Sequence, residues 1–136
     1  MSQKPIYEID GSRFSTLEGF YDEISNVLIP GAKWGHNLDA FNDILRGGFG
    51  TPEGGFVLRW ANSALSRDRL GYPETVRQLE LRLKRCHPAN RQQVAQHQKD
   101  ATEEKGSTVF DWLVEIIRVH DAGGSEGEDG VELILV

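Results

Sequence analysis

A chain of 136 residues with 38% hydrophobic content is long enough for one compact domain and short for two, so we expect a single domain over residues 1–136. Its formal net charge of -6 argues against direct nucleic-acid binding and is compatible with a basic protein partner. Cys86 is the only cysteine, which excludes an internal disulfide bond, and no apolar run approaches the roughly 20 residues of a membrane span.

The N-terminal part predicts a strand and then a helix. Residues 1–10 lack the apolar region of a signal peptide, and with the single cysteine this favours a cytoplasmic protein. Residues 5–9 have the pattern of a short strand, which a turn at Asp10 and Gly11 ends. Ser15 or Thr16 is a suitable cap for the helix that follows, and Pro30 with Gly31 ends it. The apolar residues of this helix recur at helical spacing: Leu17, Phe20, Tyr21, Ile24, Val27 and Leu28.

A second helix is predicted from Asn37, a good N-cap, to about Leu45, with Gly47 at the expected left-handed stop. Its apolar side carries Leu38, Phe41, Ile44 and Leu45. Its opposite side carries Asp39, Asn42, Asp43 and Arg46, and His36 precedes the helix. Two carboxylates therefore share a solvent-facing stripe. By spacing alone, a solvated face in which Asp43 pairs with Arg46 is the favoured interpretation.

A glycine-rich stretch and a strand come next. Residues 47–55 lack the Lys-Ser or Lys-Thr pair of a nucleotide-binding loop, so we expect a flexible connection. Residues 56–60 predict a strand whose apolar start indicates a buried central position. Residues 61–65 predict a single helical turn.

Residues 66–105 differ in character, with nine basic and six acidic side chains. Pro73 and Glu74 suit the first turn of a helix that runs to Cys86 and is broken at His87 and Pro88. Residues 89–104 are strongly polar and predict an exposed or mobile helix. Val94 and Ala95 are its only candidates for burial.

The C-terminal part predicts a helix and a strand. Ser107 or Thr108 caps a helix with the strongest apolar stripe of the chain, and residues 131–136 form a closing strand after the acidic loop 122–130. Strands alternating with helices indicate an α/β fold with a small three-stranded parallel sheet packed by helices.

Residue types that carry catalysis or bind metals do not form a known pattern. The four histidines lack metal-ligand spacing with Cys86, and we interpret all of them as surface or structural residues. No nucleophile motif surrounds a serine, and Asp39 and Asp43 lie on a convex helix. We therefore expect no catalytic residues, no metal site and no cofactor.

Eight residues around the second helix carry a more specific signal: Trp34, Gly35, Asn37, Leu38, Asp39, Ala40, Asp43 and Gly47. This pattern resembles the core signature of the barstar family of ribonuclease inhibitors. The resemblance implies the barstar-like α/β fold and makes residues 66–105, approximately, a helical insertion. It also implies that Asp43 is the central anchor in the basic active site of a ribonuclease, that Asp39 supports it and, by a looser alignment, that Glu115 is a further acidic contact.

The chain also departs from the family pattern. Family aromatic residues are replaced by Lys33, Asn42 and Gly48, and a threonine by Arg46. These changes remove interface area and place positive charge beside the aspartates. The residues expected at the partner interface are Lys33, Trp34, His36, Asp39, Asn42, Asp43, Arg46, Gly47 and Glu115.

The residues and the family resemblance together indicate two functions. The first is a barstar-like inhibitor that blocks a basic ribonuclease or related toxin nuclease, in an immunity role. The alternative is a barstar-fold regulatory or scaffold protein that binds a partner through the basic inserted helix at residues 74–85.

Overall fold

The computed structural model describes residues 4–47, 49–52, 54–121 and 124–136, and it has three parallel strands. They are β1 (Ile6–Asp10), β2 (Phe56–Ala61) and β3 (Val131–Leu135), in the order β1-β2-β3. In the middle of the sheet Leu58 lies between Tyr7 and Leu133. The predicted α/β fold with a three-stranded parallel sheet is confirmed, and so is the central position of β2. Gly48, Glu53, Ala122 and Gly123, within the two predicted loops, lie outside the described residues.

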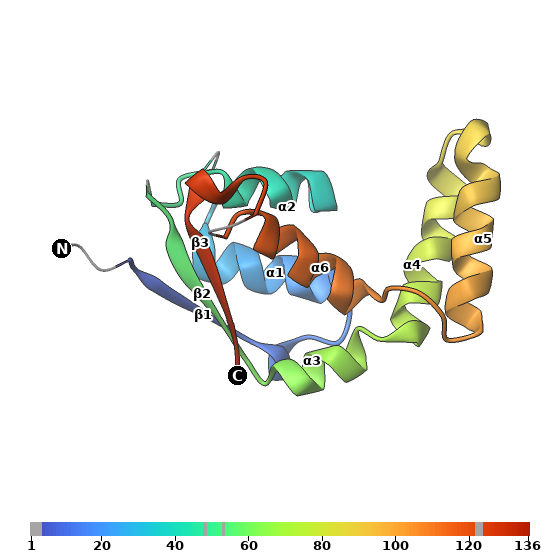
Figure 1. The fold of residues 1–136 in the computed structure, drawn as a ribbon, viewed down its shortest axis with the longest axis horizontal. Coiled ribbons are helices and arrows are strands. Elements are labelled where there is room, and N and C mark those ends of the chain that lie inside the picture. The colour runs from blue at the N-terminus through green and yellow to red at the C-terminus, as the bar shows by residue number, and fades with distance from the viewer. Residues whose placement is uncertain (1–3, 48, 53, 122–123) are drawn as a thin grey trace.

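Six α-helices occur in the described residues: α1 (Leu17–Leu28), α2 (Leu38–Leu45), α3 (Ser63–Arg69), α4 (Tyr72–Arg85), α5 (Arg91–Thr102) and α6 (Val109–Val119). Figure 1 shows α1, α2 and α6 together on one side of the sheet. Thr16 caps α1, and Thr108 forms a capping box with Asp111 at the start of α6, as the sequence predicts. Among the described helices, none is long and apolar enough to cross a lipid bilayer.

Aromatic side chains fill the space between the sheet and these helices. Trp60, on the central strand, is fully buried and contacts the rings of Phe14, Phe20 and Phe110. Phe20 also packs edge to face against Phe41 of α2, with 5.2 Å between ring centroids. Such pairs add to the free energy gained from apolar burial. The core therefore joins α1, α2 and α6 to the same strand.

The segment after β2 forms more helix than predicted. A single turn was expected at residues 61–65, whereas Ala61 still belongs to β2 and α3 runs from Ser63 to Arg69. Ser66 is fully buried, and its hydroxyl accepts a hydrogen bond from Trp60 Nε1 at 2.9 Å. Leu70 is buried at the end of the helix. These tertiary contacts extend a helix that local sequence signals do not mark.

The helices α4 and α5 form a hairpin that stands apart from the sheet, on the far side of α1 and α6 (Figure 1). Its base is fixed to the body. Glu74 is buried, and its carboxylate accepts a hydrogen bond from Leu17 N at 2.8 Å, while Thr75 Oγ1 accepts one from Val109 N at 2.9 Å. The first turn of α4 thus caps the start of α1 and the start of α6.

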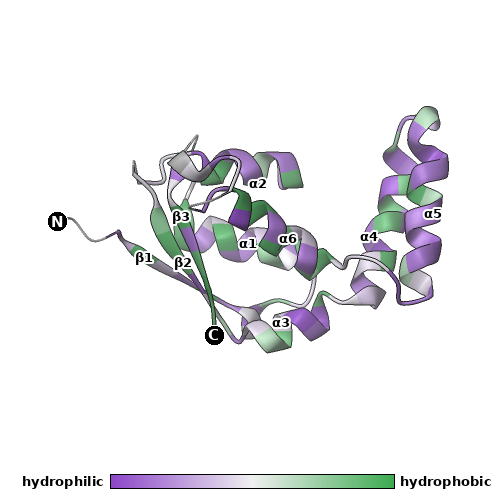
Figure 2. Ribbon diagram, viewed as in Figure 1, coloured by the Kyte–Doolittle hydropathy of each residue, from purple (hydrophilic) through white to green (hydrophobic). Residues whose placement is uncertain are grey.

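The second arm of the hairpin is an exposed helix, as predicted, and Figure 2 shows it as largely hydrophilic. The prediction of its inward residues was partly wrong. Val94 is half-buried, but Ala95 is exposed, and the buried residue is Ala101 near the end of α5. The low apolar content of α5 did not indicate burial at position 101.

We predict that Leu113→Ala, in the fully buried face of α6, lowers the free energy of unfolding by about 2–5 kcal/mol, because it leaves a cavity under the sheet. Urea denaturation followed by circular dichroism measures this change. Glu115→Ala, two residues further along the same helix and exposed, is the control and should change stability by less than about 0.5 kcal/mol. Equal effects of the two substitutions would contradict the packing described for α6.

Candidate partner-binding site

Helix α2 has the bounds and caps that the sequence predicts. The side chain of Asn37 accepts a hydrogen bond from Ala40 N at 2.8 Å, and Gly47 has a φ of +96°, which suits glycine at a helix end. The apolar side of the helix is buried through Phe41, Ile44 and Leu45. Both ends and one face are therefore fixed, and the opposite face keeps a defined position.

The outward face of α2 presents the two aspartates. Asp39 and Asp43 are both exposed, and the side chain of Asp43 keeps 57% of its accessible surface. In the described part of the chain, Asp39 has neither an ion pair nor a side-chain hydrogen bond. It lies in the first turn, where the helix dipole favours a negative charge. Two carboxylates one helical turn apart thus face solvent.

An aromatic stack leads into α2. Trp34, expected at the partner interface, is half-buried, and its Nε1 donates a hydrogen bond to Ser25 Oγ at 2.6 Å. The His36 ring lies 4.5 Å from the Trp34 ring and 5.9 Å from the Tyr21 ring. His36 is exposed and has a φ of +47°, in the left-handed region. The stack fixes His36 beside the start of the acidic face.

Arg46 pairs mainly with Glu126 rather than with Asp43. Its Nε donates to Glu126 Oε2 at 3.0 Å, a second guanidinium nitrogen contacts Glu126 Oε1, and the Asp43 carboxylate is 3.5 Å away. The hydrogen bond from Arg46 lowers the pKa of Glu126, and the same bond raises the pKa of Arg46. The predicted Asp43 to Arg46 pair is therefore present, but the charge of Arg46 is largely balanced by Glu126.

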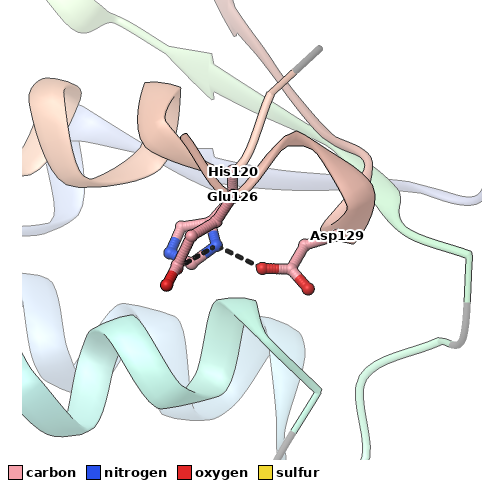
Figure 3. Close-up of side chains that lie close together, drawn as sticks. All are labelled: His120, Glu126 and Asp129. Carbon is pink, nitrogen blue, oxygen red and sulfur yellow. Dashed lines mark hydrogen bonds and ion pairs between the residues drawn. The ribbon is translucent and has the colours of Figure 1, made fainter. Parts of the chain in front are cut away.

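Glu126 also belongs to a buried histidine cluster (Figure 3). His120 is fully buried, and its Nδ1 lies 2.6 Å from Asp129 Oδ2 and 3.3 Å from Glu126 Oε2. Its Nε2 lies 2.6 Å from Asn42 Oδ1. Asn42, expected at the partner interface, thus directs its side-chain oxygen inward, and the cluster fastens the loop after α6 to the middle of α2.

The cluster around His120 was not predicted, although His120 was expected to be a surface or structural residue. One signal was available, because His120 lies seven residues after Leu113 and so continues the buried stripe of α6. The nitrogen and carboxylate atoms of His120, Glu126 and Asp129 lie within 4.8 Å of one another, which suits a metal ion. However, the Glu126 carboxylate already accepts a hydrogen bond from Arg46, and the His120 ring contacts the carboxylates of both Glu126 and Asp129. These contacts already use the candidate ligand atoms, so the arrangement is explained as a network of polar contacts that links α2 to the loop after α6.

The remaining predicted interface residues are exposed. Lys33 precedes the aromatic stack, Gly47 ends α2, and Glu115 lies on the outer side of α6. Neither Lys33 nor Glu115 has an ion pair within the residues described. Their contact with a partner stays a prediction.

A family model described as Barstar (barnase inhibitor) matches residues 5–96, more than half of the chain. The chain belongs to the barstar family. The matched range contains β1, α1, α2 and β2, and with α2 both aspartates of the acidic face. It also extends through α4 into α5, so the bounds of the insertion predicted at about 66–105 stay a prediction. No match was found among curated proteins or among solved structures.

We predict that Arg46→Met lowers the melting temperature of this barstar-family protein at pH 7, and that the difference from the unsubstituted protein shrinks as the pH falls below 4.5. The pKa of Glu126 is lowered from 4.5 in the folded protein, so its ion pair stabilises the fold above that pH and is lost as the carboxylate becomes protonated. Thermal melts at several pH values measure the difference. Arg118→Met, exposed on α6, is the control and should show no such trend. A difference that persists in acid would contradict the assigned pair.

Proposed function

We propose that this protein is an inhibitor of a basic ribonuclease or related toxin nuclease, and that it blocks the active site of that enzyme with Asp39 and Asp43. The observation that carries this proposal is the capped helix α2, anchored through its apolar side and presenting two exposed carboxylates on the other. Membership of a family described by barnase inhibition supports it. In this role the protein has no catalytic residues of its own and acts in the cytoplasm as an immunity protein.

Carboxylates on a rigid helix suit a site that binds phosphate groups. A nuclease holds its substrate's backbone with basic side chains, and a carboxylate offers those side chains the same negative charge and hydrogen-bond acceptors without a bond to cleave. Asp39 and Asp43 lie one turn apart, about 6 Å along the helix axis. Because α2 is already fixed, little conformational entropy is lost on binding.

The positive charges near the aspartates set the specificity of this surface. Arg46 pairs more closely with Glu126 than with Asp43, so it balances Asp43 only in part, whereas Lys33 has no ion pair among the described residues and can approach a partner. A cation beside the acidic face disfavours a pocket whose rim is strongly basic and favours one with an acidic group at that place. The nuclease that fits therefore carries basic side chains at its centre and an acidic group near Lys33.

The other predicted contacts divide into two groups. His36, Gly47 and Glu115 are exposed and are proposed to contact the nuclease directly. Trp34 and Asn42 have inward hydrogen bonds to Ser25 and His120 and are proposed to contribute by positioning α2. Their substitution would then reduce stability as well as affinity.

The first test is the rate at which the complex with a basic nuclease dissociates, with the nuclease encoded beside this gene as the first choice of partner. Asp43→Ala should raise the dissociation rate about 30-fold or more, since loss of a central anchor costs about 2 kcal/mol or more. Asp68→Ala, exposed on α3, which Figure 1 shows at the other end of the sheet from α2, is the matched control and should leave the rate unchanged. A complex that forms equally well with Asp43→Ala would show that the acidic face is not the binding site.

A second function, that of a scaffold binding through the hairpin of α4 and α5, is favoured by one observation. The last turn of α4 carries Arg82, Lys84 and Arg85, all exposed. Under this alternative, charge reversal on the hairpin abolishes partner binding while Asp43→Ala has no effect. The same assay therefore separates the two functions.

A further inference from the structure

A cavity of about 540 Å³ separates the start of α2 from α4. Its apolar floor is formed by Leu17, Tyr21, Leu38 and Leu81, from three different helices. Its volume lies within the range of about 300–1,000 Å³ that is typical of binding sites. We refer to it as the α2–α4 groove. Figure 1 shows that α4 stands apart from the sheet. Leu81, Arg82 and Arg85 of α4 line one side of the groove.

The two walls of the α2–α4 groove carry opposite charges. The α4 wall contributes Arg82 and Arg85, which have no carboxylate partner among the described residues. The Arg82 guanidinium lies 5.4 Å above the Trp112 ring, which fixes its position without neutralising it. The α2 wall contributes Asp39. Glu18 also lines the groove, but its carboxylate is bound to Arg77 and to Gln78.

This charge pattern restricts what the groove accepts. A nucleic-acid backbone would bring phosphates to both walls, and Asp39 would repel them. A small anion would contact the arginines and leave the apolar floor open to water. A polypeptide segment with an apolar side chain between a basic and an acidic residue can contact all three parts of the groove. The apolar side chain packs on the floor, the basic residue pairs with Asp39, and the acidic residue pairs with the arginines.

We propose that the α2–α4 groove receives such a segment of the nuclease, with its basic residue at Asp39 and its carboxylate at Arg82 and Arg85. This inference rests on the proposed function, because Asp39 belongs both to the groove and to the acidic face of α2. The segment would therefore lie directly beside the basic active site. The hairpin then adds a second contact region, in which apolar burial replaces the area lost with the aromatic residues of the family pattern.

The double substitution Arg82→Glu with Arg85→Glu tests the groove in the intact protein. Its dissociation constant for the nuclease should rise about tenfold or more, because two attractive charges become repulsive. Lys84→Glu is the matched control, since Lys84 is exposed on the same helix and does not line the groove. It should change the constant by less than about twofold. Arg85→Glu alone, which leaves the Arg82 contact with Trp112 intact, should give an intermediate loss even if the double variant is poorly folded.

Each outcome of this experiment has a defined meaning. If the arginine variants bind as tightly as the unsubstituted protein while Asp43→Ala weakens binding, the groove inference is wrong and the inhibitor function stands. If Lys84→Glu weakens binding as much as Arg85→Glu, the effect is general charge attraction and the groove inference is again wrong. If Asp43→Ala has no effect on the complex, the proposed function itself fails. Self-association that the arginine substitutions abolish would assign the groove to a second copy of the chain and overturn the inference.

Discussion

Burial of the apolar side of α2 is the constraint on which the rest of this structure depends. Phe41, Ile44 and Leu45 are nearly inaccessible to solvent, and Phe41 meets Phe20 in the aromatic core around the central strand. Rotation of the helix about its axis would bring these side chains into water and carboxylates into the core, which is strongly unfavourable. The direction in which Asp39 and Asp43 point is therefore set by the core, although neither takes part in it.

The polar contacts around α2 follow from the same constraint. His120 continues the buried face of α6 and reaches the side of α2 at Asn42, while the partly buried carboxylates of Glu126 and Asp129 contact its Nδ1. Glu126 also accepts a hydrogen bond from Arg46 at 3.0 Å, shorter than the 3.5 Å contact of Arg46 with Asp43, so Arg46 is shared between the two carboxylates. The hydrogen bonds of the buried imidazole to Asp129 and Asn42 join the loop after α6 to α2. Asp39 and Asp43 both stay exposed to solvent beside this cluster.

Local signals in the sequence predicted much of the fold. Caps at Thr16, Asn37 and Thr108 and the apolar spacing between them fixed α1, α2 and α6 correctly, since these helices have clear starts and one buried face. The extent of α3 was not predicted, because Ser66 is buried through a tertiary contact with Trp60. The candidate site was predicted only in part. The aspartates follow from spacing and family resemblance, whereas the His120 cluster joins residues 78 positions apart, and no local pattern reports such a contact.

The central claim is that this protein occupies the place of the substrate's phosphate groups in a basic nuclease. Competition with a short oligonucleotide that the nuclease binds but cannot cleave tests it most directly. The account predicts that the apparent dissociation constant of the protein complex rises in proportion to the oligonucleotide concentration, because the two ligands exclude each other. A ternary complex of nuclease, oligonucleotide and inhibitor, with the affinity of the protein unchanged, would contradict it.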